Sequence, residues 1–249
     1  MSRKAEALGL TVLWNDPPLQ RKTGDQRYLP LNDVLDADIV TLHVPLTKTG
    51  PDRTFRLAGR DFFERLSPKS IFINSSRGPV VDEEAYQESR RSGAPVKVIM
   101  DVWEGEPTID RRMVTAADIA TQHIAGHSFD AKVNGTMMIY RAVCQFLGTE
   151  PVWDPSPLLP PPDCPALSFE EVVGDEEGAI HRAVSQVYDI MEDDAALRRV
   201  TNDPQADVGK NFLELRKNYR VRREFHNTVV ETVSEPLKSK LAGIGFTTE

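Results

Sequence analysis

Short apolar runs that end in polar residues recur along the first 150 residues of the chain. They lie at residues 10–14, 39–43, 70–74, 96–101 and 119–122. Stretches with helical spacing or helix-capping residues alternate with them, at 32–37, 59–66, 83–92 and 128–147. Apolar runs of this length are typical of strands buried in a parallel sheet. The alternation of the two patterns predicts an α/β domain with a doubly wound parallel sheet.

A proline-rich stretch follows this domain. Residues 151–165 contain seven prolines, and since proline lacks a backbone donor and fixes φ, we expect neither a helix nor a central strand there. We predict domains at 1–150 and 166–249, joined by this connector. Patterns in the second domain indicate helices and strands at 176–192, 208–218, 228–233, 235–241 and 245–248. They predict a small α+β domain that completes its core against a partner.

Composition narrows the possible partners. The net charge of −8 argues against nucleic acid or an anionic membrane as the main partner. Cys144 and Cys164 are the two cysteines, which is no disulfide framework and suits a reducing cytoplasm. No apolar run is long enough to span a bilayer, and the first residues lack the apolar core of a signal peptide. No Cys/His cluster has the spacing of a zinc site, so we expect no metal.

Three predicted strand ends carry side chains suited to acid–base chemistry on a carboxylate substrate. Arg77, Glu106 and His123 lie in polar segments that follow the runs at 70–74, 96–101 and 119–122. An arginine can hold a carboxylate by two parallel hydrogen bonds. An imidazole can take a proton near neutral pH, and a carboxylate beside it can orient the ring and stabilise its charged form.

The segments Ile71–Asp82, Asp101–Pro107 and His123–Gly126 resemble the D-isomer-specific 2-hydroxyacid dehydrogenases. Residues Leu215–Tyr219 and Arg222–Glu224 resemble a biosynthetic branch of that family. The resemblance implies oxidation of the C2 hydroxyl of a phosphorylated 2-hydroxy acid, with the hydride passing to NAD. The product would be a 2-oxo acid on the route to pyridoxal phosphate.

The resemblance also implies residue roles. His123 would remove the hydroxyl proton, Glu106 would hydrogen-bond the other ring nitrogen, and Arg77 would hold the substrate carboxylate. Cofactor contacts would come from Asp16, Val44, Ser75, Ser76, Arg77, Asp101 and Gly126, and a substrate contact from His127. Asp16 would accept hydrogen bonds from the adenosine ribose, which favours NAD over NADP.

A simpler interpretation exists for several of these residues. His123 could be a core histidine, Asp16 a turn aspartate before proline, and Glu104 could take the place of Glu106. The basic residues near the end of the chain could form a solvated surface, or one of them could reach a substrate phosphate; they are Arg216, Lys217, Arg220, Arg222 and Arg223.

One element of the family pattern is absent: no G-x-G-x-x-G occurs in the 249 residues. We therefore expect an incomplete Rossmann-like sheet without its first strand and glycine loop, followed by the α+β dimerisation domain. With the strand order 3-2-1-4-5-6, the runs at 10–14 and 39–43 would lie on one side of a gap and the runs at 70–74, 96–101 and 119–122 on the other. The gap could stay open or close by re-pairing.

Two other functions stay open from the sequence. The chain could be an inactive fragment, or it could be a non-catalytic NAD-sensing or dimerisation protein of the same fold. The family resemblance implies that the C-terminal domain makes a homodimer.

Overall fold

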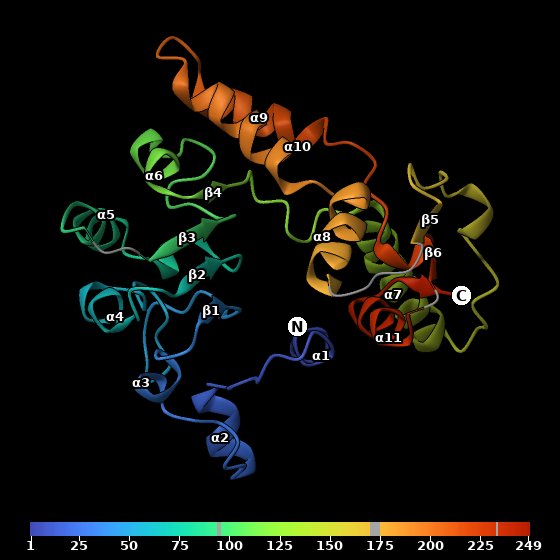
Figure 1. Ribbon diagram of the computed structural model, residues 1–249, viewed down its shortest axis with the longest axis horizontal. Helices are drawn as coiled ribbons and strands as arrows, with labels where there is room; N and C mark the ends of the chain where they lie inside the picture. Colours follow the sequence, from blue (N-terminus) through green and yellow to red (C-terminus); the bar gives the residue numbers. More distant parts are fainter. Residues whose placement is uncertain (94–95, 170–174, 233) are drawn as a thin grey trace. The chain divides into compact units, whose positions relative to one another are not determined.

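The computed structural model describes residues 1–93, 96–169, 175–232 and 234–249 (Figure 1). The chain divides into two compact units, and each is built from separate stretches of sequence. One unit, here called the sheet unit, comprises residues 13–125 and 190–219. The other, here called the terminal unit, comprises residues 1–12, 126–189 and 220–249.

Four parallel strands form the centre of the sheet unit. They lie side by side in the order β1–β2–β3–β4, with bounds Ile39–Leu42, Ile71–Asn74, Lys97–Met100 and Ile119–Ala120 (Figure 1). Because all neighbouring pairs are parallel, the carboxyl ends of the strands meet at one edge of the sheet. The predicted fold class, a Rossmann-like parallel α/β sheet, is confirmed.

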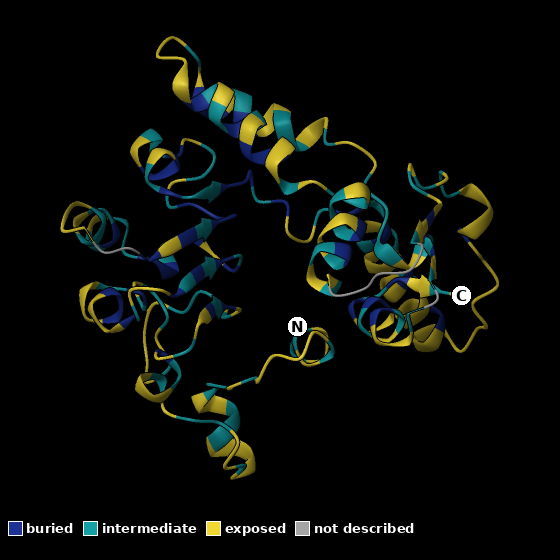
Figure 2. Ribbon diagram, viewed as in Figure 1, coloured by how far each residue is buried: buried dark blue, intermediate teal, exposed yellow. Residues whose placement is uncertain are grey.

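Helices cover one face of this sheet. Figure 1 shows α4, α5 and α6 along the same side of the strands. The strand residues alternate accordingly, since Val40, Phe72 and Val98 are buried whereas Ile39 and Lys97 are exposed (Figure 2). The helices of the sheet unit are α2 (Pro17–Thr23), α3 (Leu31–Val34), α4 (Arg60–Arg65), α5 (Glu83–Arg91), α6 (Arg111–Ala116), α9 (Ile190–Asn202) and α10 (Val208–Lys217), with a 3-10 turn η1 (Gly78–Val80).

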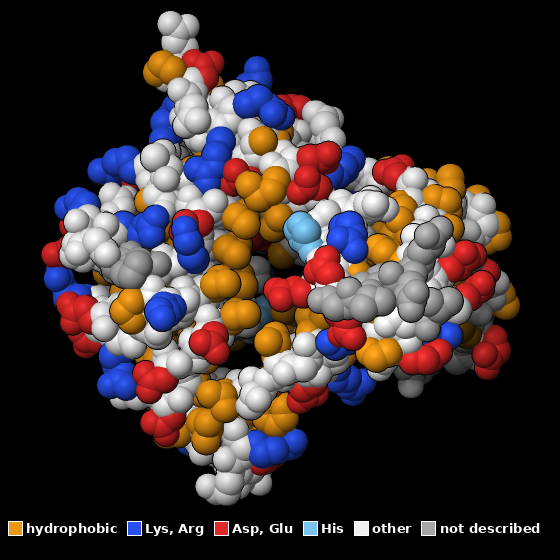
Figure 3. All heavy atoms as spheres, viewed as in Figure 1, with side chains coloured by type: hydrophobic (Ala, Val, Ile, Leu, Met, Phe, Trp, Pro, Cys, Tyr) orange, Lys and Arg blue, Asp and Glu red, His pale blue; other side chains and the backbone are white. Residues whose placement is uncertain are grey.

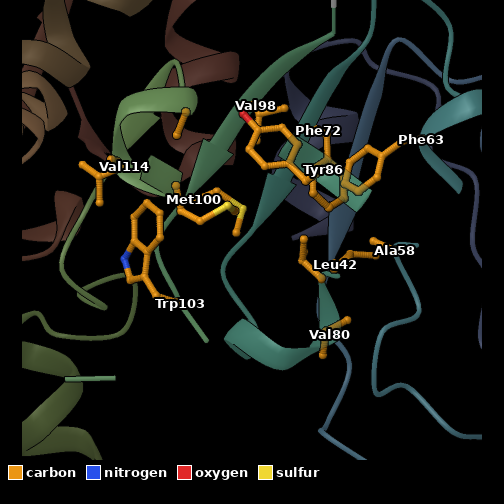
Figure 4. Close-up of a cluster of buried hydrophobic side chains, with 14 of the residues drawn as sticks. Leu42, Ala58, Phe63, Phe72, Val80, Tyr86, Val98, Met100, Trp103 and Val114 are labelled. Carbon is orange, nitrogen blue, oxygen red and sulfur yellow. The ribbon is translucent and has the colours of Figure 1, made fainter. Parts of the chain in front are cut away.

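Aromatic side chains fill the core between the sheet and these helices (Figure 4). Phe72 on β2 has no exposed surface, and its ring lies edge-on to those of Phe62 and Phe63, at centroid distances of 5.4 and 5.5 Å. Such edge-to-face pairs are favourable beyond the apolar area they bury. The core therefore fixes α4 against the centre of the sheet.

The predicted strand at 10–14 is wrong. Residues 10–13 form no strand, and Trp14 makes only an isolated parallel bridge to Tyr28. Leu10 and Leu13 are exposed, so no apolar burial stabilises an extended ladder there. Tyr28 is the partner that the sequence analysis missed.

The gap expected beside the strand at 39–43 is closed by re-pairing, one of the two outcomes that the sequence left open. The strand at 39–42 pairs directly with the strand at 71–74, in the register Ile39↔Ile71 to Leu42↔Asn74. It was expected on the far side of a gap. In the described structure the four-stranded sheet is continuous, and the Trp14–Tyr28 bridge lies outside it.

Helices α9 and α10 pack on the β4 side of the sheet unit, although the sequence analysis assigned them to the second domain. The Asp194 carboxylate accepts a hydrogen bond from the Ala120 amide at 2.7 Å. Arg198 donates to the carbonyls of Val114 and Ala117 at 2.9 and 2.8 Å, which satisfies free carbonyls at the end of α6. The boundary at 151–165 stays a prediction, while residues 190–219 belong to the compact unit that holds the parallel sheet.

The terminal unit is built around a second parallel sheet, in the order β5–β6–β7. Its elements are α1 (Ser2–Ala7), α7 (Phe129–Leu147), η2 (Ser156–Leu158), β5 (Ala166–Phe169), α8 (Glu176–Val187), η3 (Phe225–Asn227), β6 (Val229–Thr232), α11 (Glu235–Ile244) and β7 (Thr247–Thr248). β5 was not predicted. The helix predicted at 176–192 is interrupted at Tyr188, whose backbone is extended. The predicted strand at 228–233 is seen as β6, and Val233 lies outside the described residues.

Both ends of the chain contribute to the terminal unit. Helix α1 packs on α11, where a Cβ at Gly243 would overlap the side chain of Ala7. Asp130 at the start of α7 forms a buried ion pair with Arg223 at 3.0 Å.

Lys and Arg side chains are interspersed with Asp and Glu over the face shown in Figure 3.

Candidate active site

Adjacent parallel strands bring the three polar segments to one edge of the sheet. Asn74, Met100 and Ala120 are paired across β2, β3 and β4. The residues that follow them therefore leave the sheet at the same edge. These are the turn that ends at Arg77, the turn that ends at Glu106, and the loop that carries His123.

Asn74 shapes the first turn. Its side-chain oxygen accepts hydrogen bonds from the amide and hydroxyl of Ser76 at 3.1 and 2.8 Å. Its amide group donates to the carbonyl of Arg77 at 3.1 Å. Asn74 is fully buried, whereas Arg77 is exposed. Hydrogen bonds to Asn74 thus fix the backbone of this turn, and the Arg77 side chain is exposed at the edge of the sheet.

Glu106 uses both carboxylate oxygens. Oε1 accepts a hydrogen bond from the Trp103 amide at 2.8 Å, and Oε2 lies 2.8 Å from Nδ1 of His123. Trp103 is 2% exposed, and its indole donates to the carbonyl of Thr121 at 2.8 Å. The amide of Glu104, the rival candidate, instead donates to Glu83 at 2.9 Å. Glu106 is thus the glutamate that contacts the imidazole.

His123 has a left-handed backbone conformation, with φ 57°. For a residue other than glycine this costs about 1 to 3 kcal/mol, which surrounding contacts must offset. Asp101 provides such contacts, because its carboxylate accepts hydrogen bonds from the Thr121 hydroxyl and from the amides of Ile124 and Ala125, at 2.6, 2.7 and 2.9 Å. Asp101 was predicted as a cofactor contact; in the structure it holds the loop around His123.

The arrangement at this edge suits proton transfer. When Nδ1–H of His123 donates to the Glu106 carboxylate, Nε2 carries the lone pair that can accept a proton. The two side chains are 32% and 22% exposed, so the pair is half-buried and still accessible. A carboxylate in this position also stabilises the imidazolium that proton uptake would produce.

The other predicted cofactor residues lie as follows. Asp16 is the N-cap of α2, where it accepts a hydrogen bond from the Leu19 amide at 2.9 Å. Val44 is half-buried after β1 and packs against the core, and Ser75 is half-buried after β2. Gly126 and His127 belong to the terminal unit, and a Cβ at Gly126 would meet no atom within 4 Å.

The basic residues near the end of the chain have different surroundings. Arg223 is buried with Asp130, and it also donates to Asn227 at 2.6 Å. The guanidinium of Arg222 lies 4.5 Å from the centre of the Tyr188 ring. The solvated interpretation of the basic run is therefore wrong for Arg223.

Sequence analysis missed the residues that support the site. Asn74 directly follows an apolar run, and such a position is typical of an asparagine that bonds backbone amides two residues on. That signal could have been used. The contact of Glu83 with the Glu104 amide joins segments 21 positions apart, and no local pattern indicates it.

The described residues contain neither a metal-binding cluster nor a helix that could cross a membrane. No group of three or more histidine, cysteine, aspartate or glutamate side chains is placed to hold a metal ion. No helix combines the length and the apolar composition that crossing a membrane requires.

Comparisons with known proteins agree with these features. Residues 1–125 match the family model described as "D-isomer specific 2-hydroxyacid dehydrogenase, NAD binding domain", and residues 158–245 match a domain of unknown function, DUF3410. The erythronate-4-phosphate dehydrogenases of Cronobacter sakazakii and Hydrogenovibrio crunogenus are 37% and 38% identical to this chain. Each comparison covers 99% of this chain and 64% of the relative.

Among solved structures, one similar chain is a D-isomer specific 2-hydroxyacid dehydrogenase from Lactobacillus delbrueckii ssp. bulgaricus in an NAD-complexed form. It is 21% identical, with a TM-score of 0.45, over 59% of this chain and 49% of that one. The chain spans 64% of the length of the two erythronate-4-phosphate dehydrogenases named above. The family model matches half of the sequence, and the chain belongs to the D-isomer specific 2-hydroxyacid dehydrogenase family.

Proposed function

We propose that a protein containing these 249 residues oxidises 4-phospho-D-erythronate to 2-oxo-3-hydroxy-4-phosphobutanoate with NAD, in the cytoplasm. The observation that carries this proposal is the hydrogen bond between His123 and Glu106 at the sheet edge where Arg77 also emerges. The names of the curated relatives support the choice of substrate.

His123 would act as the base that accepts the hydroxyl proton of the substrate. Its Nε2 would accept the proton of the C2 hydroxyl while Nδ1 stays bonded to Glu106. Glu106 is held by the Trp103 amide, so the imidazole keeps its orientation as it becomes charged. The resulting imidazolium and carboxylate form an ion pair at a half-buried site, where charge–charge attraction is stronger than in water.

Arg77 would bind the substrate carboxylate. Its guanidinium is exposed, and one of its Nη atoms donates to the carbonyl of Ser76 at 2.6 Å. The remaining donors of the planar group can grip a carboxylate in two places, which a lysine cannot do. The same group can polarise the carbonyl that forms at C2.

The carboxyl edge of the sheet fits a dinucleotide, because ligands of open parallel sheets bind there. Asp16, Val44, Ser75 and Ser76 of the sheet unit are the residues that would hold it. When bound, NAD supplies the hydride acceptor. We propose that firm binding also needs a glycine-rich loop of the kind that cradles a pyrophosphate, which these residues do not include.

A direct test compares two proteins. One is the 249-residue chain, and the other is a chimera that joins to it the part of the Cronobacter sakazakii relative that the chain does not cover. We expect the chimera to bind NAD at micromolar concentration in calorimetry and to reduce it when 4-phospho-D-erythronate is added, whereas the 249-residue chain binds NAD poorly. NAD binding by the chimera without oxidation would contradict the proposal and support the non-catalytic alternative.

We also propose a homodimer formed through the terminal unit. Helix α7 exposes a stripe of apolar side chains at helical spacing, Met138, Ile139, Val143, Phe146 and Leu147. Phe146 is 88% exposed. Contiguous apolar surface of this kind marks a protein interface on a soluble domain. A second copy of the chain offers the same stripe, and two such stripes can pack against each other in a two-fold arrangement.

Replacing Phe146 with aspartate is expected to convert the dimer to a monomer, because a carboxylate buried at the centre of an apolar interface loses its hydration. Light scattering measures the mass. Leu213→Asp on α10 is the matched control, since Leu213 is also exposed but lies in the sheet unit. An unchanged mass for Phe146→Asp, or a monomeric parent protein, would contradict the proposed interface. Truncation at residue 151 is a poorer test, because it removes the core residues Leu197 and Phe212.

A further inference from the structure

The peptide group between Trp103 and Glu104 is held on two sides. On one side lies Gly78, where a Cβ would overlap the Trp103 carbonyl and the Glu104 amide nitrogen. Only glycine permits this close approach of two backbones. On the other side the Glu104 amide donates to the carboxylate of Glu83 at 2.9 Å. This arrangement is here called the peptide clamp.

The peptide clamp connects the segments that carry the proposed catalytic side chains. Gly78 directly follows Arg77, and Glu83 lies at the start of α5, behind the N-cap Asp82. The Trp103 amide, next to the clamped peptide, donates to the same Glu106 that bonds His123. Any shift of the clamped peptide therefore moves Glu106 relative to Arg77.

We propose that Glu83 is a positioning residue: its carboxylate fixes the Trp103–Glu104 peptide and, through it, the Glu106–His123 pair. The proposal deepens the function proposed above and rests on it for its catalytic meaning. The contacts of Glu83 are not needed for substrate or cofactor binding as described, so its effect is distinct from that of the residues that would touch them.

The surroundings of Glu83 add a dependence on pH. Burial raises the pKa of Glu83 to about 7, partly opposed by the hydrogen bond from the Glu104 amide. The charged groups that face it from other segments, or that flank it on α5, are Glu104, Asp110, Arg112, Asp82 and Glu84. The carboxylates of Glu104 and Asp110 raise the pKa further, and Arg112 lowers it. An ionised Glu83 accepts the stronger, charge-assisted hydrogen bond, so the clamp tightens as pH rises through neutrality.

A rise in pH strengthens the hydrogen bond that Glu83 accepts, but it lowers the contribution of Glu83 to the stability of the fold. The pKa of Glu83 in the folded protein, about 7, lies above its ordinary value of 4.5. Between these two values the unfolded chain releases the proton first, so the contribution of Glu83 to stability is lost as pH rises and reaches its minimum above pH 7. Below pH 4.5 both states are protonated and the contribution is fully present.

The first experiment uses the 249-residue protein and does not depend on activity. Proton NMR observes the low-field resonance of the His123 Nδ1 proton in its hydrogen bond to Glu106. We expect Glu83→Ala to shift or broaden this resonance, and Glu83→Gln, which retains an acceptor oxygen, to restore it. Glu84→Ala is the control, because it removes the same charge from an exposed neighbouring position. An identical resonance in Glu83→Ala and the parent would overturn the proposal.

The second measurement follows urea denaturation across pH. The midpoint of Glu83→Gln relative to the parent is expected to rise between pH 4.5 and about pH 7 and then to level off. A constant difference would show that the Glu83 carboxyl is not buried as described. In the chimera, Glu83→Ala is expected to lower kcat by about tenfold to a hundredfold, the usual effect of a small misplacement. If the parent chimera is inactive, the proposed function is refuted. The positioning role of Glu83 is still decided by the NMR result.

Discussion

Replacing His123 with alanine in the chimera is expected to lower kcat by about a hundredfold to ten-thousandfold, the usual share of a positioned acid–base group. The physical reason lies in the contact of 2.8 Å between its Nδ1 and Glu106. This contact fixes the ring so that Nε2 alone is available to the substrate. Alanine removes the proton acceptor and leaves the Glu106 carboxylate bonded to the Trp103 amide alone.

Steady-state kinetics with 4-phospho-D-erythronate measure this effect. His181→Ala is the matched control, because His181 is an exposed histidine on α8 in the terminal unit. Its kcat should stay within a few-fold of the parent. A His123→Ala variant with a kcat close to that of the parent would show that the proton leaves by another route.

Replacing Phe72 with alanine is expected to lower the free energy of unfolding by about 3 to 5 kcal/mol, the range measured for buried phenylalanines. Phe72 is completely buried on the central strand β2, and its ring contacts two others, those of Phe62 and Phe63. Alanine would leave a cavity between the sheet and α4 and would remove both aromatic pairs.

Urea denaturation, monitored by circular dichroism, measures this decrease in the free energy of unfolding. Phe72→Leu keeps most of the side-chain volume and is expected to cost less than half as much. If alanine cost under about 1 kcal/mol, as is usual for exposed positions, the core around β2 would not have the packing described above.

The sequence predicted those elements in which local pattern and tertiary burial agree. The run at 70–74 became β2, because Phe72 is buried against the rings of Phe62 and Phe63 on α4. The helical stretches predicted at 83–92 and 128–147 became α5 and α7, which begin at the side-chain caps Asp82 and Ser128. The run at 10–14 was equally apolar but has no sheet to bury it, and so the prediction of a strand was wrong there.

The candidate site could be predicted only in part, because the sequence identifies residues but not the contacts between them. Glu106 and Glu104 lie two positions apart and are chemically equivalent. Only the turn after β3 determines which of them reaches His123, 17 positions further on. Gly78 and Glu83 support the site through contacts with backbone atoms, and such contacts leave no pattern of side-chain types in the sequence.

In the proposed reaction, a hydride passes from C2 of 4-phospho-D-erythronate to NAD while His123 takes the hydroxyl proton. To test this, the chimera is supplied with 4-phospho-D-erythronate that carries deuterium at C2. Mass spectrometry then determines the mass of the NADH formed. We expect one deuterium in each NADH molecule, and loss of nearly all product in the His123→Ala chimera. NADH without deuterium, or no NADH from a chimera that binds NAD, would contradict it.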